Sequence, residues 1–211
     1  MYAALIATAA LSGPAMADAL TPSSYSFDQA TGQGTWSYPD ASFTKLTDGV
    51  LGNAGWGHNE GSEWAGWSSK SLVNIDFVFS SFVNVASITF YSAQDRLDDV
   101  VLPSLSVFSS TDGLTWVLQG GLETPPNPAN NNHYQSGGPA TELVIGGLDF
   151  VSRYVRVAAT SNGPWIFASE VTFDGSAVAV PGPEAGAGLG ALALGGMALY
   201  MKRRRKNEVI A

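Results

Sequence analysis

Apolar and polar residues alternate along several short segments of the chain, with the period of a β-strand that has one buried face. The clearest alternation lies over residues 73–79, 86–90, 154–157 and 170–173. Turn sequences rich in Gly, Asp and Asn separate these segments, and no apolar period of 3.6 residues is sustained before Ala185. We therefore expect an all-β domain, folded as an antiparallel β-sandwich of the jelly-roll type.

The clearest hairpin surrounds Asp112-Gly113, with strands over 104–109 and 115–119. Asp-Gly is a typical turn dipeptide because glycine accepts a positive φ. Trp116 follows this turn and Tyr154 lies on a central strand, so we expect both rings in the core. The Pro- and Asn-rich stretch 124–139 is predicted to be a long loop.

Both ends of the chain have the composition of targeting segments. Residues 1–17 are apolar and end in Ala15-Met16-Ala17, a pattern that predicts signal peptidase cleavage; a short buried helix is the alternative. Residues 185–201 are uncharged and precede five basic residues at 202–206, which predicts a single transmembrane helix of about 26 Å with its basic end in the cytoplasm. The predicted division is a signal peptide over 1–17, a domain over 18–179 and a tail over 180–211.

Composition and charge exclude several classes of function. The chain has no cysteine, which excludes disulfides, cysteine-ligated metals and thiol nucleophiles. Between Asp18 and Val180, sixteen acidic and five basic residues give a net charge of −11, which repels nucleic acid. The sequence has no nucleophile-elbow, zinc-protease or phosphate-loop motif, and His58 and His133 lie in loop-like sequence. We expect a protein that is not an enzyme.

An ordered set of short motifs resembles a coagulation-factor type C, or discoidin-like, domain over roughly residues 42–175. The set consists of Leu46-Thr47-Asp48-Gly49, the strand 73–79, Ser110-Thr111-Asp112-Gly113-Leu114-Thr115-Trp116, Arg153-Tyr154-Val155-Arg156 and Ala168-Ser169-Glu170-Val171. The resemblance implies a galactose-binding-like jelly roll. It also implies binding of glycans, lipid head groups or proteins through loops at one end of the sandwich.

The tail resembles the PEP-CTERM sorting signals of bacteria. Val180, Pro181, Pro183 and Glu184 form a variant of their proline motif, ahead of the apolar stretch and the basic cluster. The resemblance implies processing by an exosortase-type transpeptidase, and delivery from the inner membrane to the surface or extracellular matrix of a Gram-negative bacterium. A plain single-pass membrane anchor is the alternative.

The discoidin-like resemblance also implies a structural calcium ion. Calcium takes about six to eight oxygen ligands, and an Asp-Gly turn offers carboxylate and carbonyl oxygens together. Asp48 and Glu170 match the family's early turn and late glutamate, with the backbone carbonyl of Lys45 as a companion ligand. The alternatives are an ordinary turn for Asp48, and an ion pair with Arg153 or Arg156 for Glu170.

A segment rich in Trp and Gly is the candidate ligand surface. Its candidate residues are Trp56, Trp64, Trp67 and His58. An indole face stacks on the C–H face of a sugar while nearby polar groups bond the hydroxyls, although tryptophans that simply cap the core are the alternative. Asp95 and Arg96 match loop positions where the discoidin-like family places ligand contacts.

Together these features predict an exported, non-catalytic module that binds polysaccharide or a cell-surface glycan. The alternative is a structural protein of the cell surface or extracellular matrix that contacts other proteins and has no small ligand.

Overall fold

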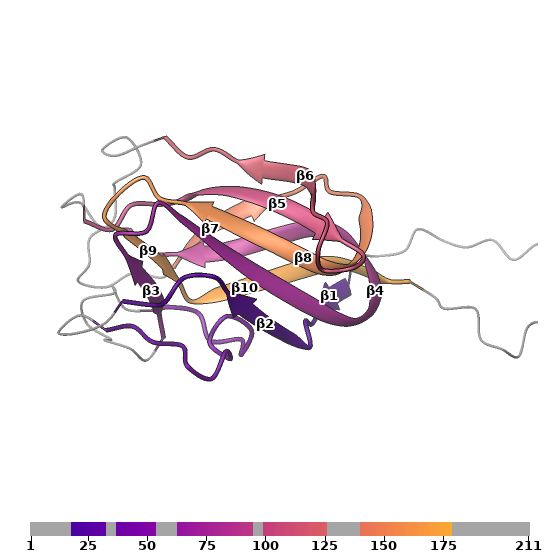
Figure 1. Ribbon diagram of the computed structural model, residues 1–211, viewed down its shortest axis with the longest axis horizontal. Helices are drawn as coiled ribbons and strands as arrows, with labels where there is room; N and C mark the ends of the chain where they lie inside the picture. Colours follow the sequence, from indigo (N-terminus) through magenta and orange to yellow (C-terminus); the bar gives the residue numbers. More distant parts are fainter. Residues whose placement is uncertain (1–17, 33–36, 54–62, 95–98, 126–139, 179–211) are drawn as a thin grey trace, which may run out of the picture. The chain divides into compact units, whose positions relative to one another are not determined.

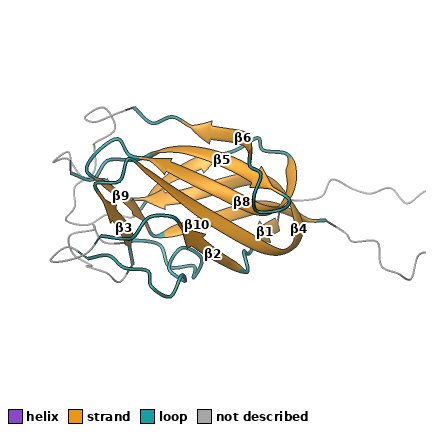
Figure 2. Ribbon diagram, in the orientation of Figure 1, coloured by secondary structure: helices purple, strands orange, loops and turns teal. Residues whose placement is uncertain are grey.

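The computed structural model describes residues 18–32, 37–53, 63–94, 99–125 and 140–178, and these contain β-strands and no helix (Figures 1 and 2). All pairings between these strands are antiparallel, so the expected all-β antiparallel fold is confirmed. The strands are β1 (Asp18–Leu20), β2 (Ser24–Phe27), β3 (Ala65–Ser68), β4 (Leu72–Ser92), β5 (Ser104–Ser110), β6 (Val117–Leu122), β7 (Thr141–Ile145), β8 (Phe150–Thr160), β9 (Trp165–Ala168) and β10 (Glu170–Ala177).

Strand β4 belongs to both layers of the sandwich. Its first part, 72–78, pairs with β2 and β8. Its second part, 83–92, pairs with β10 and β7, and with β8 over residues 83–85. The register against β8 shifts between Val78 and Val83, where the strand bends (Figure 1). The hydrogen-bonded order is β1-β10-β4-β8-β5-β6, with β2 and β7 also on β4, and β3 and β9 form a separate pair.

The alternation pattern predicted two strands, over 73–79 and 86–90, where the structure has one. Residues 80–82 are exposed and look like a turn in the sequence, but they stay extended through the bend. A single chain segment therefore carries the connection between the two layers.

The core lies between the layers that the two parts of β4 form. Phe77 and Phe79 point inward from the first layer and are at most 2% exposed. Phe173 of β10 meets both rings from the other layer, with ring centroids 4.9 and 5.3 Å away. Burying one such ring stabilises a fold by about 2–3 kcal/mol, so these contacts hold the layers together.

The predicted β5–β6 hairpin is confirmed, and Asp112 fixes its turn. The Asp112 carboxylate accepts hydrogen bonds from the backbone N–H groups of Thr115 and Leu114, both at 2.8 Å, and from the Ser110 hydroxyl at 2.9 Å. These bonds favour the charged form and lower the pKa of Asp112 to about 2. Gly113 has a φ of 74°, which glycine adopts without strain.

Trp116 and Tyr154 do not lie in the core, which corrects the expectation from the sequence. Val155 and Val157 take the buried positions of β8, so the alternate residues, Tyr154 among them, face outward. Tyr154 packs against Gly113 of the hairpin turn, and Trp116 is partly exposed above the Arg156 guanidinium, 4.2 Å from its ring centroid.

Residues 1–17 and 179–211 lie outside the described residues, and with them the predicted signal peptide, sorting motif, transmembrane stretch and basic cluster. By its internal contacts the chain divides into a unit of residues 1–178 and a unit of residues 179–211. The part of the chain that the structure describes contains no helix that could span a bilayer.

The register shift between β10 and β4, at Asp174 and Gly175, yields a test of the fold. A Cβ atom added to Gly175 would lie 1.9 Å from the backbone oxygen of Asn84 on β4, so Gly175→Ala should displace the β4–β10 pairing. We expect a loss of stability of about 1–3 kcal/mol in urea unfolding. Gly146→Ala is the matched control, because a Cβ there meets no atom within 4 Å, and its effect should stay within about 0.5 kcal/mol. Equal urea unfolding midpoints for the two variants would contradict the predicted clash between residue 175 and the Asn84 backbone.

Candidate functional site

Trp64 and Trp67, two of the predicted ligand residues, are core residues. Trp67 is fully buried; its ring meets Phe27 edge-on at 5.3 Å, and its indole N–H donates to the carbonyl of Gln29 at 3.1 Å. Trp64 is 1% exposed and packs against Phe167 and against Gly52, where a Cβ would come within 2.2 Å of its ring. Neither ring offers a face to a ligand, so the prediction that these two stack on a sugar is wrong.

The other predicted ligand residues, Trp56, His58, Asp95 and Arg96, lie outside the described residues. The structure does place the residues that flank them. Trp64 contacts Phe167 of β9, and the backbone carbonyl of Asp99 accepts a hydrogen bond from the backbone N–H of Trp165 at 3.2 Å. Trp64 and Asp99, which follow segments 54–62 and 95–98 in the chain, therefore both lie beside β9. We call this end of the sandwich, which carries β3 and β9, the β9 end (Figure 1).

Trp165, at the start of β9, is the aromatic residue of this end that the sequence interpretation missed. Its ring stacks on Phe167, with centroids 5.3 Å apart and an interplanar angle of 25°, and meets Tyr38 edge-on at 5.7 Å. Phe167 and Tyr38 are fully buried, whereas Trp165 is partly exposed. One face of the indole is thus held by rigid core rings while part of the ring reaches solvent. Its only signal in the sequence is a position directly after Gly163-Pro164.

Polar groups flank this ring at the β9 end. Glu63 and Asp99 are partly exposed there, and the Glu63 carboxylate accepts a hydrogen bond from the Asn53 N–H at 2.8 Å, which ties the two ends of segment 54–62 together. Carboxylate and carbonyl oxygens are acceptors for hydroxyl groups. The β9 end therefore combines a supported aromatic face with hydrogen-bond acceptors.

The predicted calcium ligands come close together, but within the described ranges no group of three acidic or histidine side chains could hold a metal ion. Glu170 is 4% exposed and accepts a hydrogen bond from the Gly49 N–H at 3.0 Å. Asp48 is exposed, and its carboxylate accepts from the Val50 N–H at 2.8 Å. The Lys45 ammonium donates to the Trp64 carbonyl at 3.0 Å. Within the described residues Glu170 forms an ion pair with neither arginine: Arg156 pairs with Asp76, and the Arg153 Nε donates to the carbonyl of Phe79.

The segment before this turn is fixed by a buried polar pair. The Tyr25 hydroxyl donates to the carboxylate of Asp40, which is 2% exposed, and it accepts from the Leu46 N–H at 3.0 Å. Asp40 also accepts from the N–H groups of Thr44 and Lys45, at 3.1 and 3.4 Å. These bonds set the position of the 47–49 turn against Glu170. A cavity of about 330 Å³ lies beside them, lined by residues 19–22, 47–49 and 170–173.

Burial makes Glu170 a pH-sensitive group. Desolvation raises its pKa to about 7, although the Gly49 N–H bond opposes this. Because the folded pKa is the higher one, the stabilising effect of the proton is complete below pH 4.5 and is lost as the pH rises through 7. With a chelator present, raising the pH from 4.5 to above 7 should lower the free energy of unfolding of the wild type by up to about 3 kcal/mol relative to Glu170→Gln. Glu142→Gln, at an exposed site on β7, is the control and should follow the wild type. A wild type that gains stability against Glu170→Gln between pH 4.5 and 7 would contradict this assignment.

No family model matches the chain, and no curated protein matches it in sequence. Solved structures do resemble it. The C-terminal domain of a chitobiase from Bacteroides fragilis has a TM-score of 0.52 and 17% identity, over 77% of this chain and all of that one.

Two modules from Clostridium perfringens are also similar in structure. A family-32 carbohydrate-binding module of a family 31 glycoside hydrolase has a TM-score of 0.48 and 18% identity, over 75% of this chain and 95% of that one. Another family-32 module, solved in complex with GalNAc-β-1,3-galactose, has a TM-score of 0.47 and 12% identity, over 74% of this chain and 99% of that one. Of these three structures, the chitobiase domain is the one with a TM-score above 0.5. At 17% identity this likeness shows a shared fold, so the chain has the β-sandwich of that domain.

Proposed function

We propose that this domain is a non-catalytic carbohydrate-binding module whose ligand is a polysaccharide or a cell-surface glycan. The observation that carries the proposal is Trp165, a partly exposed indole stacked on a buried ring at the β9 end. An indole held in this way loses little conformational entropy when a sugar ring stacks on the part of it that reaches solvent. The fold shared with the chitobiase domain and the excess of acidic residues over basic ones agree with a neutral, hydroxyl-rich ligand.

The site in this proposal is the β9 end. Trp165 supplies the stacking face, and Glu63 supplies hydrogen-bond acceptors. We include the predicted residues Trp56, His58, Asp95 and Arg96 in the proposed site, because Trp64 and Asp99, which follow their segments in the chain, contact β9. Sugar recognition of this kind needs no bond-making step, so no catalytic residue is assigned.

Export belongs to the same proposal and is supported by the sequence alone. The A-x-A pattern at Ala15 and Ala17 supports cleavage by signal peptidase. The motif at 180–184, the apolar stretch 185–201 and the basic cluster 202–206 support a membrane-anchored intermediate that an exosortase-type transpeptidase releases to the surface or matrix. An exported module is placed where polysaccharide is available to it.

The test of the carbohydrate proposal is a glycan array probed with the purified protein, with and without calcium. We expect binding to a restricted set of glycans, weakened by Trp165→Ala by about threefold to tenfold. Trp165→Phe, which keeps a ring on Phe167, should retain part of the affinity, and near-equal melting temperatures would show that both variants are folded. No sugar-dependent signal on any glycan would refute the proposal and favour the structural matrix protein.

A structural calcium ion at the 47–49 turn is the second part of the proposal. The chemistry of the donors supports this part: the Asp48 and Glu170 carboxylates are hard oxygens, Glu170 accepts from the Gly49 N–H of the turn, and the Lys45 carbonyl is the proposed further ligand. Bound calcium would cross-link the turn to β10 and neutralise the Glu170 charge.

Calcium binding would raise the melting temperature, because an ion that binds only the folded state stabilises it. We expect calcium to raise the melting temperature of the wild type and a chelator to lower it, while Glu170→Gln should lose most of this response. Magnesium serves as the control ion, since its octahedral geometry suits such a site poorly. Identical melts with calcium and with chelator would rule the ion out.

A further inference from the structure

The outer face of the sheet formed by β2, β4, β8 and β5 carries planar side chains that the proposed function does not use. The strand register sets Ser26, Asp76, Arg156 and Phe108 in one row across this face. The side chains of Arg156 and Asp76 keep 25% and 31% exposure. The cluster, which we call the β4–β8 platform, consists of Asp28, Asn74, Asp76, Arg156 and Trp116.

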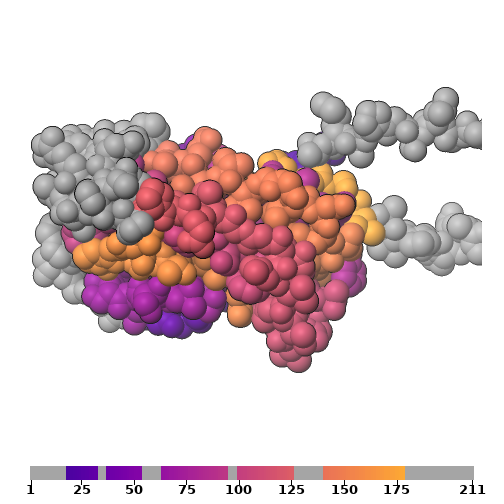
Figure 3. All heavy atoms as spheres, turned by 90° about the horizontal axis from the view of Figure 1, so that it is seen from above, coloured from indigo at the N-terminus to yellow at the C-terminus, as the bar shows by residue number. Residues whose placement is uncertain are grey.

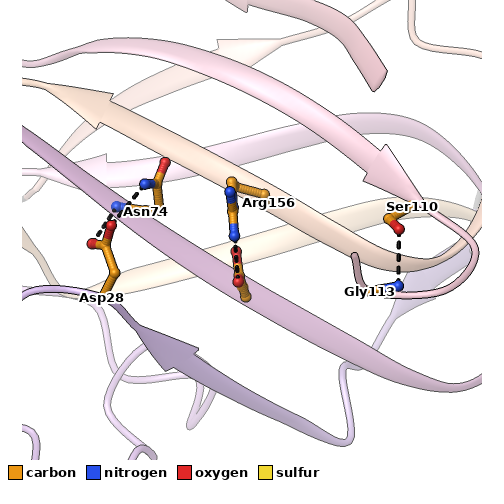
Figure 4. A network of polar contacts seen from close by, with 6 residues as sticks. Asp28, Asn74, Ser110, Gly113 and Arg156 are labelled. Atoms are coloured by element: carbon orange, nitrogen blue, oxygen red, sulfur yellow. Dashed lines mark hydrogen bonds and ion pairs between the residues drawn. The ribbon is translucent and has the colours of Figure 1, made fainter. Parts of the chain in front are cut away.

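Arg156 is the rigid base of the β4–β8 platform. Its Nε and Nη2 donate to the two Asp76 carboxylate oxygens at 2.6 and 2.8 Å, so the guanidinium plane is held by a two-point bond (Figure 4). The Trp116 ring lies against this plane, 4.2 Å from the guanidinium carbon. An indole in contact with a clamped guanidinium is supported on one face, as Trp165 is supported by Phe167.

Trp116 is presented by a turn that is itself rigid. The Asp112 carboxylate holds the N–H groups of Leu114 and Thr115, and the Ser110 hydroxyl accepts from the Gly113 N–H at 2.9 Å (Figure 4). In Figure 3 the β5–β6 segment projects from the body as a separate lobe, and the surface steps back beside it. The ring therefore lies over Arg156 of the sheet, and the turn sets its position before any ligand arrives.

Further polar groups extend the β4–β8 platform along β4. Asp28 accepts from the Asn74 backbone N–H at 2.9 Å and from its side-chain amide at 2.7 Å (Figure 4). Asn74 and Asp76 are same-face neighbours on β4, about 6.6 Å apart along the strand. Each of these groups keeps unused capacity: Arg156 has five donors and spends two on Asp76, and each carboxylate has about four acceptor positions and spends two.

We infer that the β4–β8 platform is a second binding site, for an uncharged, hydroxyl-rich saccharide, separate from the β9 end. Trp116 stacks on the sugar ring, and Arg156, Asp76, Asn74 and Asp28 donate to and accept from its hydroxyls. The balance of two carboxylates and one guanidinium, itself neutralised by Asp76, disfavours anionic sugars. The inference shares a ligand class with the proposed function but none of its residues.

A direct test is ¹⁹F NMR of the full chain labelled with 5-fluorotryptophan. The Trp116 resonance is assigned by its loss in Trp116→Phe. The probes are chitohexaose, cellohexaose and GalNAc-β-1,3-galactose as neutral sugars, and polygalacturonate as the anionic one. We expect at least one neutral sugar to shift the Trp116 resonance saturably, with no shift from polygalacturonate. A purely structural Trp116 would not respond to sugar at all.

Variants separate the two sites. Trp165→Ala should leave the Trp116 response unchanged, and Trp116→Ala should weaken binding of the responding neutral sugar about threefold to tenfold. Leu114→Ala is the matched control, since Leu114 belongs to the same turn and is 84% exposed, and it should bind as the wild type does. If the glycan array fails while Trp116 still responds, the proposed site fails and this inference stands.

Three results would overturn the inference. The first is a Trp116 resonance that no neutral sugar moves at tens of millimolar. The second is a response to polygalacturonate alone, which would assign an anionic ligand. The third is a shift that depends on protein concentration and not on sugar, which would assign the face to contact with a second copy of the chain. Because the spectrum is recorded on the unsubstituted chain, poor folding of Trp116→Ala would not obscure any of them.

Discussion

The double pairing of β4 is the constraint on which the rest of the structure depends. One strand pairs with β2 through its first part, with β10 and β7 through its second, and with β8 through both, so its bend sets the relation of the two layers. The inward rings of β4 then meet Phe173 of β10. The same alternation sends Asn74 and Asp76 outward, so the core and the β4–β8 platform are opposite faces of one register.

Two aromatic surfaces follow from this frame, and they share a physical principle. Trp165 rests on a buried ring and Trp116 on a clamped guanidinium, so in each case rigid neighbours hold the indole from one side. Preorganisation of this kind matters for weak ligands, because the entropy of ordering a side chain would otherwise consume much of a small binding energy. Two such sites on one domain could engage one polymer together, and the gain then comes from effective concentration rather than from new contacts.

The strands and turns were predictable from the sequence because their signals are local. Alternation over 73–79 and 170–173 and the Asp112-Gly113 turn depend on neighbours in the chain, and the structure contains all three. The join within β4 was not predictable, since pairing partners on other strands keep residues 80–82 extended.

The candidate site was much less predictable, because exposure of an aromatic ring is decided by distant partners. Composition drew attention to Trp64 and Trp67, yet Phe167 and Phe27 cover them. Trp116 seemed a core residue until the register placed Arg156 beneath it, and the Arg156–Asp76 pair joins residues 80 positions apart. A sequence shows which side chains could bind a ligand. The face of the sandwich on which each side chain lies depends on how the strands pair.

The pairing of β1 with β10 sets Asp18 directly opposite Gly175, so the domain begins and ends on neighbouring strands. A domain with adjacent ends can be spliced into a surface loop of a host protein at little cost in loop-closure entropy. Because the chain has no cysteine, such a fusion would need no oxidising compartment to fold. The β1–β10 pair thus makes this sandwich a portable insert for protein engineering as well as a unit of its own chain.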